Sequence, residues 1–241
     1  MEQDLQKKLY TADDLVRIII QLRDKENGCP WDKVQTHTSI RKNFLEETLE
    51  ALEAIDADDP AMMREELGDV LMQVVFHSVI EAERGHFTFD DVCTEVCRKL
   101  IFRHPHIYGT PEEKKTGIID WNVIKNKEKG RRTLADEIST VPETFPALMK
   151  AQKLQKRVQR VTGEKPELEE AEAAVNASHT ALQAQMASGA DPAALQAQAG
   201  QYLFDVVRWL GASGMDAEEV LELYNRSYAQ QKINESNSAQ A

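Results

Sequence analysis

Acidic side chains recur along one predicted helix, which runs from about Ser39 to Asp56. At about 100° of rotation per residue, they fall on one face of that helix, opposite an apolar stripe. An acidic face by itself is usually only a solvated surface. If these side chains do chemistry, partner groups must come from another element. The residues of this face are Glu46, Glu47, Glu50 and Glu53.

The next predicted helix, from Pro60 to about Arg84, carries a polar stripe on an apolar surface. Residues 67–80 are apolar almost all round, so this helix is expected to be buried. A carboxylate beside a buried surface is costly unless it is paired or bound to a metal. The basic residues of the helix lie on another face or about four turns away. The stripe consists of Glu66, Asp69, Gln73 and His77.

A short turn at residues 58–60 is expected to make these two helices antiparallel neighbours. Two carboxylate pairs spaced i, i+3 can then converge on one cavity. A cluster of this kind repels itself without a cation, and Mg²⁺ prefers carboxylate oxygens. The sequence therefore predicts a metal site for Mg²⁺, with Mn²⁺ as an alternative. Its candidate ligands are Glu47, Glu50, Glu66 and Asp69.

The spacing of these carboxylates resembles the signature of the MazG nucleoside triphosphate pyrophosphohydrolases, which belong to the all-α NTP pyrophosphatase superfamily. The resemblance covers nearly the whole chain, because other motifs agree with it. These motifs are Cys29-Pro30-Trp31-Asp32 with Gln35-Thr36-His37, Glu65-Glu66-Leu67-Gly68-Asp69, Arg103-His104-Pro105-His106, and Pro146-Ala147-Leu148 with Lys153-Leu154-Gln155-Lys156.

The resemblance implies that the protein hydrolyses a nucleoside triphosphate to the monophosphate and diphosphate. Attack at the α-phosphorus needs a positioned water and a metal that neutralises charge on the phosphates. By analogy with the family, the four candidate ligands hold Mg²⁺, and the catalytic group comprises Glu46, Glu47 and Glu50. Glu46 would hold a further metal, or orient or deprotonate the water.

Three further residues are candidates for substrate binding. Lys99 and Arg103 are spaced i, i+4 near the end of a predicted helix that begins after Thr88. They could bind phosphate oxygens, or they could simply stabilise the helix C-terminus. Trp31 could stack on a base or anchor its loop on the bundle.

The second half of the sequence resembles the first. Residues 67–71 are echoed by residues 199–203, and residues 74–75 by residues 206–207. We predict an all-α fold of two tandem MazG-like helical bundles, the second degenerate. Amides bind Mg²⁺ poorly, so the second copy is expected to lack metal. The positions matching Glu50, Glu66, Asp69 and Lys99 are Ala173, Gln198, Gln201 and Ser227.

The predicted boundaries follow from the proline-rich and glycine-rich joints. The first domain covers residues 1–110, and a linker with a short helix at about 118–129 covers residues 111–144. The degenerate domain covers residues 145–233, and residues 234–241 are expected to be a disordered tail.

Composition excludes several other classes of protein. The 241 residues include 41 acidic and 29 basic side chains, which give a formal net charge of −12. This balance argues against binding to nucleic acid polymers, which requires a basic surface. The apolar stretch at residues 70–80 is too short to span a membrane. The N-terminus lacks the apolar core of a signal peptide, and three cysteines cannot all pair, so we expect a cytoplasmic protein.

Two alternatives stay open on the sequence alone. One is a catalytically weak helical scaffold whose acidic groove binds a metal or a protein partner. The other is a narrower enzyme that acts on dUTP or on phosphoribosyl-ATP. The family resemblance also implies a homodimer, and the apolar helix at residues 67–80 is compatible with one.

Overall fold

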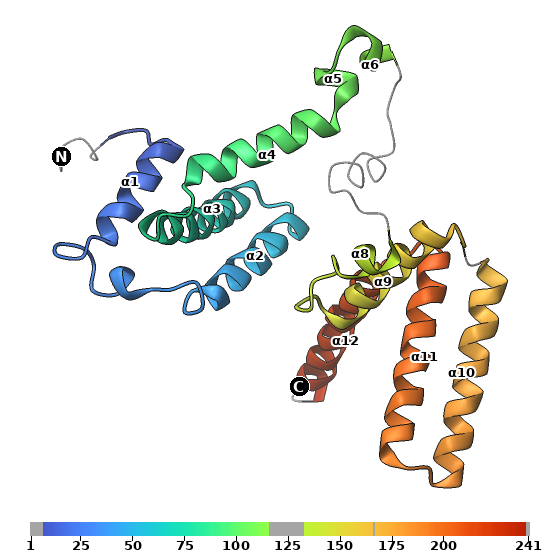
Figure 1. Cartoon of the computed structure of the whole chain (residues 1–241). Coiled ribbons are helices and arrows are strands. Elements are labelled where there is room, and N and C mark those ends of the chain that lie inside the picture. Colours follow the sequence, from blue (N-terminus) through green and yellow to red (C-terminus); the bar gives the residue numbers. More distant parts are fainter. Residues whose placement is uncertain (1–6, 116–132, 166, 240–241) are drawn as a thin grey trace. The chain divides into compact units, whose positions relative to one another are not determined.

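The chain folds into helices that form two compact units, residues 1–121 and 122–241. A computed structural model describes residues 7–115, 133–165 and 167–239. Within these ranges there is no strand, which confirms the all-α prediction (Figure 1). Across the same ranges, no helix has the length and apolar character that a membrane crossing requires.

The first unit is built around one long helix, α3. Figure 1 shows α1 and α4 on this helix, with α2 alongside it as the other arm of a hairpin. The described elements of this unit are α1 (Ala12–Leu22), the 3-10 turn η2 (Asp32–Val34), α2 (Arg41–Asp56), α3 (Pro60–Glu83), α4 (Phe89–Arg103), α5 (Pro105–Tyr108) and α6 (Pro111–Lys115).

Side-chain caps fix the starts of three helices in this unit. Thr11 begins α1 and Thr88 begins α4, each in a reciprocal capping box with an aspartate three residues later. Asp59 caps α3, and Pro60 takes the first helical position. The helix predicted from about Ser39 is α2, which begins at Arg41. Ile40 holds the N-cap position without a side-chain hydrogen bond, and the Ser39 hydroxyl bonds to groups of the preceding turn.

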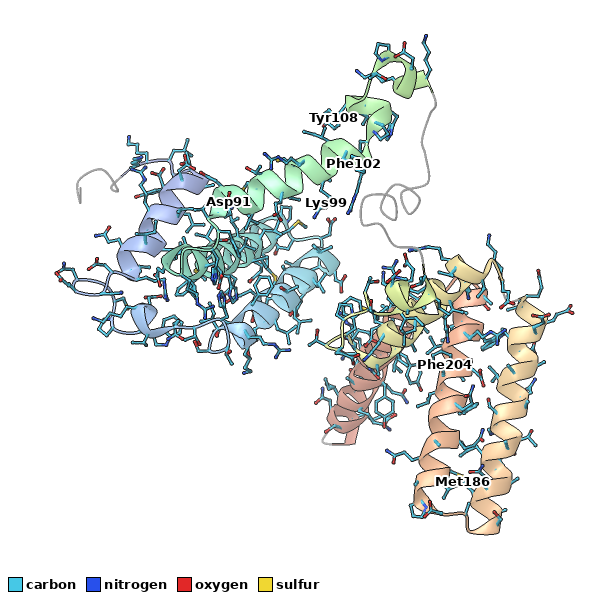
Figure 2. All side chains as sticks on the ribbon, in the orientation of Figure 1. Asp91, Lys99, Phe102, Tyr108, Met186 and Phe204 are labelled. Carbon is cyan, nitrogen blue, oxygen red and sulfur yellow. The ribbon has the colours of Figure 1, made fainter. Side chains whose placement is uncertain are left out.

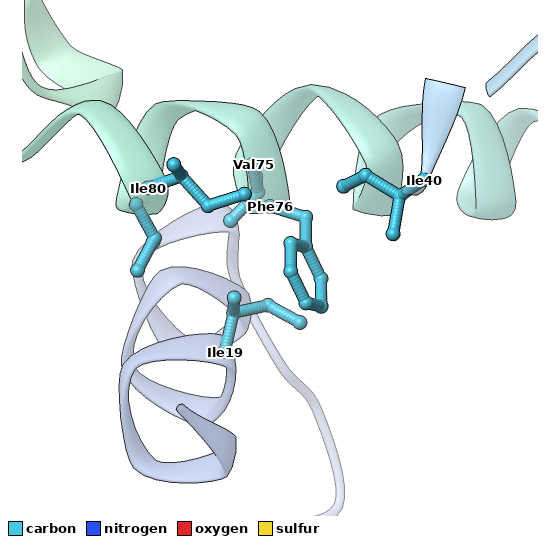
Figure 3. Packing of buried hydrophobic residues seen from close by; sticks show 6 residues of the cluster. Ile19, Ile40, Val75, Phe76 and Ile80 are labelled. Atoms are coloured by element: carbon cyan, nitrogen blue, oxygen red, sulfur yellow. The ribbon is translucent and has the colours of Figure 1, made fainter. Parts of the chain in front are cut away.

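The core of the first unit lies where α1 crosses the C-terminal half of α3 (Figure 3). Apolar side chains of both helices meet there with Ile40, the residue that precedes α2. Burying such side chains contributes about 1.5–3 kcal/mol each relative to exposure. The buried cluster comprises Ile19, Ile40, Val75, Phe76, Val79 and Ile80.

Helix α2 packs on α3 in an orientation that its apolar pattern does not suggest. Its buried residues are Ala51 and Ala54, which share a face with Glu47. Its larger apolar side chains stay about half exposed, and Leu49, for example, is 55% exposed. The first half of α3 is also more open than predicted, since Leu67 is 50% exposed. The expectation of burial all along this helix is therefore wrong for its N-terminal half, where α2 is the main neighbour.

The second unit repeats the helical hairpin. Helices α10 and α11 pair along their length, while α9 contacts α8, α11 and α12. Glycines with positive φ end two of these helices, Gly163 after α9 and Gly189 after α10. The described elements are α8 (Leu134–Ile138), α9 (Ala147–Thr162), α10 (Leu168–Ser188), α11 (Pro192–Ala212) and α12 (Ala217–Ala239).

Burial in the two long central helices follows the predicted repeat. Val75 of α3 matches Val207 of α11, and both are almost fully buried. Gln73 matches Asp205, and these polar side chains are buried to a similar degree. The pattern is consistent with two copies of one helical unit.

Two predicted boundaries need correction. Residues 133–144 belong with the second unit, because Glu137 of α8 is buried against α9 and pairs with Arg157 at 2.8 Å. The residues described beyond 233 are helical, since α12 continues to Ala239. Contacts between side chains one turn apart support this extension, such as the bond from Gln231 to Glu235. The predicted helix at 118–129 lies outside the described residues.

Candidate metal centre

Three carboxylates from the α2–α3 hairpin converge in the first unit. Glu47 comes from α2, and Glu66 and Asp69 come from the first half of α3. One oxygen from each side chain lies within 4.8 Å of the other two, and all three residues are half-buried. The short turn before α3, which Asp59 caps, brings the two helices together, as the sequence predicts.

Burial and mutual repulsion dominate the electrostatics of two of these carboxyls. Burial and the charges of Asp69 and Glu50 raise the pKa of the Glu47 carboxyl. Burial and the charges of Glu50 and Asp69 likewise raise the pKa of Glu66. No basic side chain is among the main influences on either group. A set of oxygen donors that repel one another and lack a counter-charge fits a hard divalent cation such as Mg²⁺.

The two other predicted carboxylates of α2 lie differently. Glu50 is exposed beside the group, and its negative charge is one of the causes that raise the pKa of Glu47. Glu46 points to another side of the helix, where its carboxylate lies 2.8 Å from the ammonium of Lys42. The structure therefore brings Glu50 to the edge of the carboxylate group and leaves Glu46 in a surface ion pair.

The predicted substrate-binding residues lie outside the carboxylate group. Lys99 and Phe102 extend from α4, the helix that leads away from the α1–α3 core (Figure 2). Lys99 is half-buried and Arg103 is 7% exposed. Trp31 precedes η2 and is 56% exposed, so its ring is accessible to solvent. Their contacts with substrate remain predictions.

Arg23 holds the loop that carries Trp31, and sequence reasoning missed it. Its Nε and Nη2 donate to the two carboxylate oxygens of Glu83 at 2.8 Å. Its Nη1 donates to the carbonyl oxygens of Asp32 at 2.7 Å and Gln35 at 3.1 Å. Because these partners are not neighbours of Arg23 in the sequence, no local pattern predicts the contacts. The arginine that directly follows an apolar helix was the available signal.

A network of histidines around the C-terminal half of α3 was also not predicted from the sequence. His77 and His37 stack with their ring centroids 5.0 Å apart and share a hydrogen bond of 2.7 Å between their Nδ1 atoms. His37 also bonds to Glu81, which accepts further bonds from His86 and Arg84. This network fixes the start of the segment before α2 against the C-terminal half of α3.

The second unit uses the matching positions for structure. Gln198 donates to the carbonyl oxygen of Ser178 at 3.3 Å, and Gln201 donates to Asp205 at 3.1 Å. Across residues 7–115, 133–165 and 167–239, the carboxylates of the first unit are the only group with metal-ligand spacing. Fold and site together define an all-α protein whose described residues include one carboxylate group with metal-ligand spacing.

Comparisons with known proteins place this class more narrowly. Residues 35–108, which contain the carboxylate group, match the MazG nucleotide pyrophosphohydrolase domain. The chain is 37% identical over 223 residues to the nucleoside triphosphate pyrophosphohydrolase of Escherichia coli strain K12, covering 90% of this chain and 83% of that protein. It is 35% identical over 218 residues to the nucleoside triphosphate pyrophosphohydrolase/pyrophosphatase MazG of Thermotoga maritima, covering 90% and 82%. The chain belongs to the MazG family, as its motifs predict.

Proposed function

We propose that this protein hydrolyses nucleoside triphosphates to the monophosphate and diphosphate at the α2–α3 hairpin. The observation that carries the proposal is the convergence of Glu47, Glu66 and Asp69 without a basic partner. The MazG domain match over the same residues and the names of the relatives support it. Glu50 completes the proposed ligand set from the edge of the group.

Each side chain of the group has a role in this proposal. Bound to these carboxylates, Mg²⁺ would neutralise charge on the phosphates. Glu47, Glu66 and Asp69, with Glu50 at the edge, would hold the cation on the hairpin. Glu50 is exposed at the edge of the group, so it would also be placed to accept a proton from the attacking water. Glu46 keeps its proposed role with the water only if its contact with Lys42 opens.

The experiment that tests this proposal measures product identity. A panel of canonical and damaged NTPs and dNTPs, with dUTP and phosphoribosyl-ATP included, is incubated with the full chain with and without Mg²⁺. We expect Mg²⁺-dependent release of diphosphate and the matching monophosphate. Glu66→Gln should abolish the release, while Glu95→Gln, at an exposed carboxylate of α4, should retain it. Orthophosphate as the product, or full turnover in Glu66→Gln, would contradict the proposal.

We also propose that the first unit pairs with a second copy through the apolar side chains that α2 leaves exposed. Contiguous exposed apolar surface on a small unit is typical of an interaction site. The stripe is on α2, the helix that also carries Glu47 and Glu50, so pairing would bring a second copy to the hairpin that holds the site. The stripe comprises Phe44, Leu45, Leu49, Leu52 and Ile55, which are 37–55% exposed.

Light scattering coupled to size exclusion tests the pairing. We expect the wild-type chain to elute as a dimer and Leu49→Glu to elute as a monomer. Leu9→Glu is the matched control, because Leu9 is exposed but lies before α1, away from the stripe. A monomeric wild-type protein, or a dimer that survives Leu49→Glu, would contradict this interface.

A further inference from the structure

A cavity of the second unit lies between α9, the segment after it and α11. Its volume is about 580 Å³. A neighbouring cavity of about 220 Å³ shares part of its lining. The volume of the larger cavity is within the usual range for small-molecule sites. The shared lining residues are Gln155, Gln159, Lys165 and Arg208.

Basic side chains line this space without ion-pair partners among the residues that the structure describes. Arg208 of α11 is half-buried, and Lys165 and Lys156 are exposed at the lining. The carboxylates in the lining are Glu164 and Glu170, and neither lies within ion-pair distance of these cations. A half-buried guanidinium with no counter-charge favours an anion, and its planar donors suit a phosphate group.

The repeat shows that this arginine stands where the first unit has a core residue. The match of Val75 with Val207 aligns Phe76 with Arg208. Phe76 is 5% exposed and fills the core with Ile19. In the second unit the same helix position carries a charged group beside open space. The degenerate copy has therefore exchanged a packed core position for a lined cavity.

The opposite part of the lining is apolar and held in place. Phe204 lies on α11 on the side of α9 (Figure 2), and Leu154 and Val158 of α9 line the same cavity. The buried side chain of Gln155 donates to the backbone carbonyl of Phe204 at 2.8 Å, which ties α9 to α11. Gln152 joins α9 to the turn before α12 in the same way. The cavity walls are thus fixed by hydrogen bonds before any ligand binds.

We propose that this cavity is a second binding site, for a nucleoside phosphate. The phosphate would bind Arg208 and Lys165, and the base would lie against Phe204 and the apolar side chains of α9. The site needs neither a metal nor the carboxylates of the first unit. It therefore goes beyond the proposed hydrolysis and gives the degenerate copy a role of its own in sensing nucleotides.

Calorimetric titration of the full chain in EDTA tests this site, because chelation removes Mg²⁺ from the first unit. The probes are ATP, AMP, diphosphate and inorganic phosphate. We expect ATP to bind, and Arg208→Gln and Lys165→Gln each to weaken it at least tenfold. Lys153→Gln, which removes an exposed charge from α9 outside the cavity, should change the affinity less than threefold. Glu66→Gln should bind ATP as the wild type does, even though it cannot hydrolyse it.

The result that overturns the proposal is equally specific. ATP that does not bind in EDTA, or that binds Arg208→Gln and Lys165→Gln unchanged, rules the site out. Binding of diphosphate and phosphate as tight as that of ATP would contradict the base contact with Phe204. Lys165 lies outside any helix, so its variant tests the charge even if Arg208→Gln disturbs folding. Circular dichroism of each variant monitors that folding.

Discussion

Replacing Arg23 by methionine should destabilise the first unit severely. The guanidinium is buried, with 7% of the residue exposed, and it makes four hydrogen bonds. The guanidinium carbon, Cζ, also lies 5.2 Å from the centroid of the Phe76 ring. Glu83 is partly exposed and can regain water, but the carbonyls of Asp32 and Gln35 lose a charged donor. Hydrogen bonds to charged groups contribute about 1.5–3 kcal/mol each, so we expect a loss of about 3–5 kcal/mol.

Urea unfolding followed by circular dichroism measures this loss. Hydrogen exchange of peptides from α1 and α3 then locates it in the first unit rather than the second. Arg23→Lys should retain part of the stability, because an ammonium keeps the charge but not the paired donors. Arg64→Met, at an exposed position of α3, should change stability by less than about 0.5 kcal/mol. A loss below about 1 kcal/mol in Arg23→Met would refute the role assigned to these bonds.

Two further predictions concern charge. Hydrogen bonds from His86, Arg84 and His37 lower the pKa of Glu81 from 4.5 to about 2, so the folded state binds fewer protons there than the unfolded state. This stabilisation is present above pH 4.5 and is lost as pH falls toward 2. The free energy of unfolding, measured as a function of pH, should therefore fall less steeply in Glu81→Gln than in the wild type. An equal slope in both proteins would contradict this prediction. Mg²⁺ should raise the thermal midpoint of the wild-type chain, by the equivalent of about 2.7 kcal/mol at a hundredfold excess over Kd. Asp69→Asn should lose this response, and an equal shift in both proteins would exclude Asp69 as a ligand.

The sequence was sufficient to predict the parts of the molecule that are set by local chemistry. The caps at Asp59 and Thr88 depend on side chains within three residues, so their helices start where predicted. The convergence of Glu47 with Asp69 needs only one short turn between two helices, and it too was predictable.

Features that depend on distant partners were not predictable. The apolar stripe of α2 indicated a core face, yet α2 packs through Ala51 and Ala54, whose small side chains let it approach α3 closely. The ion pair between Arg23 and Glu83 joins the residue after α1 to the last residue of α3, and no sequence pattern links the two positions. Residues 234–239 are polar, and their sequence showed no sign of a helix. Side-chain bonds between residues one turn apart, such as Gln230 to Asn234, support the helix there.

The carboxylate group lies entirely within one helical hairpin, residues 41–83, and this has a consequence for how the site arises during folding. Closing so short a loop costs little entropy, and contacts between near neighbours in sequence form early. The ligands can therefore meet before the rest of the chain has folded, or even been synthesised. Each hairpin can therefore keep or lose its own carboxylate group independently. Amides on α11 remove the group from the second hairpin without requiring any change in the first.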